Sequence, residues 1–153
     1  MLLSILKGAA AGAAGTTALN ASTYLDMTVR ARPTSSTPED TVEQLAEVTH
    51  LRIPGQGEAR DNRVAGLGPL SGIATGVGVG ALLGLTRALH WRPPLVVGAA
   101  AATLLALVGA NGPMTALGIT DPRTWSLESW ITDVVSHLAY GIVTAATLDG
   151  LDS

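Results

Sequence analysis

Residues 66–89 read GLGPLSGIATGVGVGALLGLTRAL, and this stretch decides the fold. It carries no charge before Arg87, and glycine recurs at every fourth position in the glycine ladder, which is Gly72, Gly76, Gly80 and Gly84. Residues four apart share one face of a helix. Each glycine costs a helix in water about 1 kcal/mol relative to alanine, whereas in lipid such a face lets another backbone approach closely. The stretch therefore predicts a membrane-spanning helix that receives a neighbour along its glycine face.

The composition extends this interpretation to the whole chain. Of 153 residues, 47% are apolar and only 14% are charged, and phenylalanine is absent. Soluble domains average about 25% charged residues, and small side chains suit helix packing in membranes. A net charge of −3 without a basic block argues against nucleic acid as a partner. The absence of cysteine excludes disulfides, thiolate catalysis and iron–sulfur clusters.

The apolar segments predict an all-α fold, a single antiparallel bundle of four transmembrane helices over residues 1–153. The expected spans are about 2–25, 64–85, 95–117 and 130–148. Gly8 and Gly12 form a second small-residue face, a candidate partner for the ladder. A secretory signal is the alternative for the first span, but Lys7 follows the Leu/Ile run instead of preceding it, which disfavours cleavage.

The first loop is the only sizeable polar segment. Thr37-Pro38-Glu39-Asp40 is a helix start, with proline in the first turn and two carboxylates at the positive end of the dipole. It predicts a short amphipathic helix, about 38–51, that lies on the membrane surface or caps the bundle. Asn111-Gly112-Pro113 is expected either to end the third span or to break it.

Basic residues are unevenly divided between the two sides of the predicted bundle. One side has Arg30, Arg32, Arg52, Arg60, Arg63 and Arg123, and the other has Lys7, Arg87 and Arg92. The positive-inside rule then places the long first loop in the cytoplasm and both termini outside. The alanine-, glycine- and arginine-rich usage suggests a bacterial source, so we expect a multi-pass protein of the bacterial plasma (inner) membrane.

Unusual polar residues gather where the first span ends, the third ends and the fourth begins. The candidates for a polar pocket opening toward the first loop are Asn20, Tyr24, Asp26, Asn111, Asp133, His137 and Tyr140. Polar groups at membrane depth are costly and usually face a bundle interior or a cavity. We expect Asn20 and Asn111 to form hydrogen bonds across helices.

Asp133 and His137 are the most informative pair, because residues four apart share a helix face. The pair is compatible with a proton relay, half of a metal site or headgroup recognition, and equally with a structural hydrogen bond inside one helix. Asp26 and Arg30 have the same spacing and predict an ion pair at the membrane edge. No catalytic residues are predicted, since Ser136 lies off the Asp133–His137 face and lacks nucleophile-elbow glycines. No cofactor or metal is predicted either, because a metal site needs further ligands and only Asp26 and His50 are candidates.

Two resemblances follow from short motifs. Gly76-Val77-Gly78-Val79-Gly80 resembles the glycine-rich inner helix of rotary ATPase ring subunits, but the matching two-span plan is missing. Arg32-Pro33 after the first span, with Trp125, Trp130, Asp133, His137 and Tyr140 at the last, resembles the uncharacterised YagU-like group of four-pass bacterial inner-membrane proteins. That resemblance implies a four-span fold and carries no activity.

The sequence leaves three functions open. The first is a non-enzymatic assembly subunit that packs through its glycine faces as a homo-oligomer or in a larger membrane complex. The alternative is a small channel or transporter that uses the polar pocket around Asp26, Asn111, Asp133 and His137. An intramembrane enzyme acting on lipid has only the Asp133–His137 pair in its favour.

Overall fold

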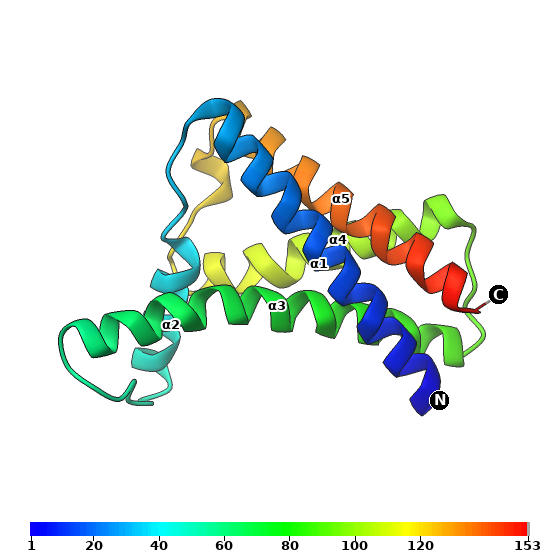
Figure 1. The fold of residues 1–153 in the computed structure, drawn as a ribbon, viewed down its shortest axis with the longest axis horizontal. Helices are drawn as coiled ribbons and strands as arrows, with labels where there is room; N and C mark the ends of the chain where they lie inside the picture. Colours follow the sequence, from blue (N-terminus) through cyan, green and yellow to red (C-terminus); the bar gives the residue numbers. More distant parts are fainter. Residues whose placement is uncertain (153) are drawn as a thin grey trace.

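The computed structural model describes residues 1–152, and this part of the chain is helical without any strand (Figure 1). The elements are α1 (Leu2–Arg30), α2 (Thr37–Val48), α3 (Glu58–Ala88), α4 (Leu95–Ala116), the 3₁₀ turn η1 (Pro122–Thr124) and α5 (Leu127–Asp152). Four of them, α1, α3, α4 and α5, are long and apolar enough to cross a membrane. The predicted all-α class with four candidate spans is therefore confirmed, and the chain is a multi-pass membrane protein.

The helices extend past the apolar segments that predicted them. Helix α3 begins at Glu58, where apolarity predicted about residue 64, and α1 continues to Arg30. Helical hydrogen bonding continues into the polar flanks, because a charged turn outside the lipid costs little. Helix α1 stops at Ala31, whose left-handed φ of 50° lets its N–H bond to the carbonyl of Met27.

Helix α4 runs past the position where the sequence predicted an end or a break. It continues through Pro113 to Ala116, so both alternatives for Asn111-Gly112-Pro113 were wrong. Proline removes only one backbone donor, and the helical bonds resume at once, with the N–H of Leu117 donating to the carbonyl of Pro113 at 2.9 Å. Gly118, with a φ of 72°, then ends this segment.

Helices α1 and α3 cross with their backbones in direct contact. A Cβ built on Gly12 would lie 2.5 Å from the carbonyl oxygen of Gly76, and one built on Gly8 would lie 2.7 Å from the Cα of Gly84. Only glycine allows this approach, because any larger residue would overlap backbone atoms that cannot move aside. Gly72, the first glycine of the ladder, has no atom within 4 Å of that position and takes no part in the crossing.

Helix α5 packs against both α1 and α4 and supplies the largest core residue, Tyr140, which is 1% exposed. Because the chain has no phenylalanine, the contacts of α5 with its neighbours are made largely by small residues. The hydroxyl of Thr103 lies over Gly141, and the hydroxyl of Thr144 lies over Gly15. Ion pairs join α1 to α5 at both ends, between Lys7 and Asp152 and between Arg30 and Glu128.

The two remaining features lie on the side of the first loop. Figure 1 shows α1 and α3 crossing near the N-terminus and then diverging, with the linkers that follow α1 and α4 running between the separated ends. The short helix α2 packs mainly on α3, with a small contact to α4. This is the predicted amphipathic helix, and it ends at Val48, earlier than expected.

Candidate functional site

The first half of α5 carries polar side chains that face two different helices. Thr132 and Ser136 are directed to α1, whereas Asp133 and His137 are directed to α4 or back along α5. Successive residues of a helix point about 100° apart, so neighbours in sequence reach different partners. The single polar pocket expected from the sequence is therefore two separate sets of contacts.

We define the Asp133 cluster as Asn111, Asp133 and His137. The amide nitrogen of Asn111 donates to one carboxylate oxygen of Asp133 at 2.9 Å. The other carboxylate oxygen lies 3.3 Å from Nδ1 of His137, and the same ring nitrogen lies 2.8 Å from the backbone carbonyl of Asp133. The His137 side chain is 8% exposed and that of Asp133 is 20% exposed. The cluster thus holds a carboxylate and an imidazole between two candidate spans.

The geometry of the cluster selects a tautomer for His137. A carbonyl only accepts hydrogen bonds, so Nδ1 carries the hydrogen and donates it to Asp133. Nε2 then bears the lone pair, and no hydrogen bond involves this atom among residues 1–152. The imidazole can accept a proton at Nε2 while the carboxylate stabilises the cation that forms, which is the chemistry of a proton relay.

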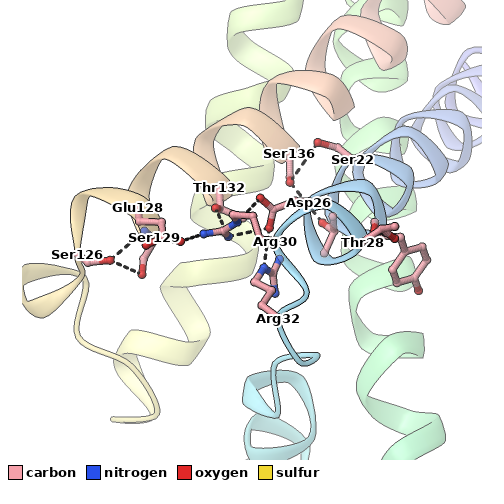
Figure 2. Close-up of polar contacts among 12 residues, drawn as sticks. Ser22, Asp26, Thr28, Arg30, Arg32, Ser126, Glu128, Ser129, Thr132 and Ser136 are labelled. Carbon is pink, nitrogen blue, oxygen red and sulfur yellow. Dashed lines mark hydrogen bonds and ion pairs between the residues drawn. The ribbon is translucent and has the colours of Figure 1, made fainter.

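We define the Asp26 cluster as Asp26, Arg30, Arg32, Glu128 and Thr132; Figure 2 shows it at the junction of α1 and α5. Arg30 donates from two nitrogens to the two oxygens of Asp26, each at 2.7 Å, and Arg32 adds a bond of 2.6 Å. Arg30 also donates to the Thr132 hydroxyl at 2.9 Å and pairs with Glu128. The predicted Asp26–Arg30 ion pair is present. Through Arg30 it also links the C-terminal end of α1 to the N-terminal end of α5.

Farther along α1 and α5, hydroxyl groups form additional contacts between the two helices. Ser136 donates to Ser22 at 3.4 Å and accepts from Thr23 at 3.3 Å (Figure 2). These bonds are long, but they satisfy groups that lipid cannot hydrate. They fix the rotation of α5 against α1, which in turn fixes the direction of His137.

The other predicted pocket residues lie apart from the Asp133 cluster. Tyr140 closes against α3, because its hydroxyl donates to the carbonyl of Gly76 at 2.6 Å. Asn20 is half-buried, and its amide makes no hydrogen bond within the described part of the chain, unlike the expected cross-helix bond. Tyr24 is 61% exposed and points outward. Of the two asparagines, only Asn111 makes the predicted contact.

Sequence reasoning missed the charged contacts at the opposite end of the bundle. Lys7 lies 3.3 Å from Asp152, and Arg87 pairs with Asp149. Taken one at a time along the chain, these residues indicate only an interfacial lysine, a tight turn and an acidic tail. For Lys7 and Asp152 the sequence offered a signal, because antiparallel packing of the first and last helices brings the start of one beside the end of the other. Arg87 and Asp149 lie at the C-terminal ends of two helices that run in the same direction through a four-helix up-and-down bundle.

A surface hollow lies away from both clusters. It has a volume of about 530 Å³ in the α4–α5 connection and is lined by Thr115, Gly118, Ile119, Thr120, Asp121, Pro122 and Arg123. None of the predicted pocket residues lines it. Arg123 donates to Asp121 at 2.8 Å and lowers the pKa of that carboxyl below its ordinary value. No set of three or more His, Asp or Glu side chains in residues 1–152 is placed to hold a metal ion.

Comparison with protein-family models, curated proteins and solved structures gives no match to this chain. Membership of the YagU-like group therefore stays a prediction that rests on the motifs around Arg32-Pro33 and the last helix. Function has to be inferred from the site itself.

Proposed function

We propose that this protein is a small, non-enzymatic membrane protein that passes protons across a bacterial plasma membrane through the Asp133 cluster. The observation that carries the proposal is the His137 ring, 8% exposed, held by Asp133 and leaving Nε2 without a hydrogen bond among residues 1–152. Ionisable groups inside membrane helices are costly to retain and commonly mark ion or proton pathways. Asn111 supports the same role by holding the carboxylate in place.

The orientation that we propose follows the positive-inside rule. Five arginines lie between the first and second spans, at positions 30, 32, 52, 60 and 63, and Arg123 lies in the connection on the same side. This places the long first loop and the Asp26 cluster at the cytoplasmic face. The Asp133 cluster is then about two helical turns from that face, within reach of cytoplasmic protons.

Proton flux into liposomes tests the proposal. Purified protein is reconstituted with a pH-sensitive dye inside the vesicles, and a potassium diffusion potential drives protons inward. We expect Asp133→Asn and His137→Gln each to reduce the flux at least tenfold, in line with the usual contribution of a positioned acid–base group, roughly 10²-fold or more. Tyr24→Phe is the matched control, since this exposed side chain should leave the flux unchanged.

The variants have to retain the fold for this comparison to be meaningful. Monodisperse elution and unchanged helicity by circular dichroism establish that point for each one. Flux equal to that of the parent protein in both Asp133→Asn and His137→Gln would refute the proposal, as would the absence of flux in the parent.

A second candidate is assembly with another copy or with a membrane partner. It is favoured by the outward face of α3, where Ala74 and Gly78 repeat the four-residue spacing and a Cβ added to Gly78 would have no atom within 4 Å. Small residues four apart on an exposed face are typical of helix association in lipid. The ladder glycines Gly76, Gly80 and Gly84 are occupied by α1, so they do not carry this candidate.

Native mass spectrometry after gentle extraction tests the assembly. We expect a defined oligomer or a heteromeric mass for the parent protein and a monomer for Gly78→Leu. Gly66→Leu, a substitution on another face of α3 that also meets no neighbour, is the control. A monomeric parent, or an assembly that survives Gly78→Leu, would contradict this candidate.

A further inference from the structure

The contact between α1 and α3 stops one step before the glycine ladder does. The two helices pair in an antiparallel register that advances four residues at a time, and the last facing pair is Thr16 and Gly76. One further step in the same register places Asn20 opposite Gly72. Yet Gly72 has nothing within 4 Å, and the amide of Asn20 has no hydrogen bond in the described residues. The two residues are matched in register but separated in space.

Helix α2 occupies the next position along α3. A Cβ on Gly68 would lie 3.0 Å from the Glu39 carboxyl carbon and 3.2 Å from the Glu39 backbone nitrogen. Continuing the α1–α3 register by one more step would bring Tyr24 to Gly68, but Tyr24 is 61% exposed instead. Glu39 thus fills the place that α1 would take if the two helices closed along their whole length.

The attachment of α2 to this place is weak. One carboxylate oxygen of Glu39, Oε2, is buried without a hydrogen-bond partner among residues 1–152, which carries a desolvation cost. The second tie, between Glu43 and Arg60, joins side chains that are 45% and 38% exposed, and such pairs contribute little. When α2 leaves Gly68, water hydrates the Glu39 carboxylate. This hydration offsets part of the free energy that is lost when α2 detaches from α3.

We propose that α2 is a removable wedge: its departure from Gly68 lets α1, together with α5, close on α3 until Asn20 meets Gly72. The ion pairs at both ends of the α1–α5 pair favour movement of the two helices as one body, and the Asn111–Asp133 hydrogen bond to α4 would lengthen in this movement. The pivot is the contact of Tyr140 with the carbonyl of Gly76, beyond which α1 and α3 diverge (Figure 1). His137 lies one turn from Tyr140 on the diverging side.

For its functional consequence this inference rests on the proposed proton path. Closure would change access to the Asp133 cluster from the side of the first loop, and α2 would then control that access. The movement itself is independent of any flux, and it can be measured on protein that transports nothing. The two proposals therefore fail in different experiments.

Disulfide trapping in the full-length protein tests the wedge, because the chain has no cysteine of its own. The reporter is the double variant Asn20→Cys/Gly72→Cys, oxidised with copper phenanthroline in native membranes. A disulfide requires Cα atoms within about 7 Å, so it forms only in the closed arrangement. We expect a low yield with α2 intact and a yield at least about threefold higher after Glu39→Ala, because alanine removes the side chain that fills the place of α1 beside Gly68.

Two control pairs and a second variant make the result decisive. Ser22→Cys/Ser136→Cys joins α1 to α5, where the two hydroxyl oxygens lie 3.4 Å apart, and should give the same yield in every background, which also reports an intact fold. Ala18→Cys/Gly72→Cys should stay reduced, because two residues along a helix turn about 200°, which puts Ala18 on nearly the opposite face of α1 from Asn20. Gly68→Ala crowds α2 with Glu39 unchanged, since its added methyl would lie 3.0 Å from the Glu39 carboxyl carbon and 3.2 Å from the Glu39 backbone nitrogen.

A rise in the 20–72 disulfide in Glu39→Ala and in Gly68→Ala, with the 22–136 yield constant, supports the wedge. An unchanged 20–72 yield in both variants overturns it. A yield that is already complete with α2 intact overturns it as well, because closure would then not need α2 to leave. Flux that is absent in all these proteins would count against the proton path alone.

Discussion

Replacing Gly80 by alanine is the most direct test of the packing that holds α1 on α3. A Cβ at Gly80 would lie 2.5 Å from the Cα of Gly12 and 2.6 Å from its backbone nitrogen, whereas ordinary contact begins at 3.4 Å. The neighbours, which include the still closer carbonyl oxygen of Gly8, are backbone atoms that have no rotamer to change, so α1 must move outward by about 1.1 Å. Every close contact along the crossing is lengthened with it.

The magnitude follows from two opposing effects. Inserting a methyl group into a packed interface costs about 1–3 kcal/mol. Alanine recovers up to about 1 kcal/mol of helix propensity relative to glycine. The upper part of the first range applies, about 2–3 kcal/mol, because the atoms met are backbone and cannot repack. We therefore expect the free energy of unfolding to fall by about 1–2 kcal/mol, which is about a five- to thirtyfold change in the unfolding equilibrium.

The assay is SDS-induced unfolding in mixed detergent micelles, followed by the fluorescence of the three tryptophans. Gly72→Ala is the matched control, being the same substitution in the same ladder at a position where nothing lies within 4 Å. It should leave the unfolding midpoint unchanged or raise it slightly. If both variants shift the midpoint equally, the reduced stability does not come from the α1–α3 crossing and the reasoning is refuted.

Two further predictions concern Tyr140 and Asp121. Tyr140→Phe keeps the ring and deletes the 2.6 Å bond to the Gly76 carbonyl, so the same SDS titration should show a loss of about 1 kcal/mol; an unchanged midpoint would contradict it. Because Arg123 lowers the pKa of Asp121 below 3.8, the stabilisation from this contact is fully present above pH 3.8 and is lost as the pH falls through the lower folded value. The fluorescence of Trp125, whose ring nitrogen donates to Thr120, should therefore stay constant down to about pH 4 and change below it, and Asp121→Asn should abolish that acid transition.

The candidate site was predictable where it depended on one helix. The spacing of Asp133 and His137 placed them on one face, because i,i+4 geometry is local and does not depend on the rest of the fold. Antiparallel order also brought Asn111 near them. Asn20 and Tyr24 lie outside the Asp133 cluster. The rotation of α1 about its own axis is set by its glycines, which pack on α3, and by Ser22 and Thr23, which contact α5.

The membrane class, the four candidate spans and the ladder were determined by the sequence alone, since hydropathy and a four-residue period are properties of consecutive residues. Only the tertiary structure decided which glycines are used. Helices that cross at an angle touch over a limited length, so the three glycines from Gly76 to Gly84 receive α1 while Gly72 stays open. With α2 docked, this angle separates the helix ends that the sequence placed together, and α2 occupies the space between them.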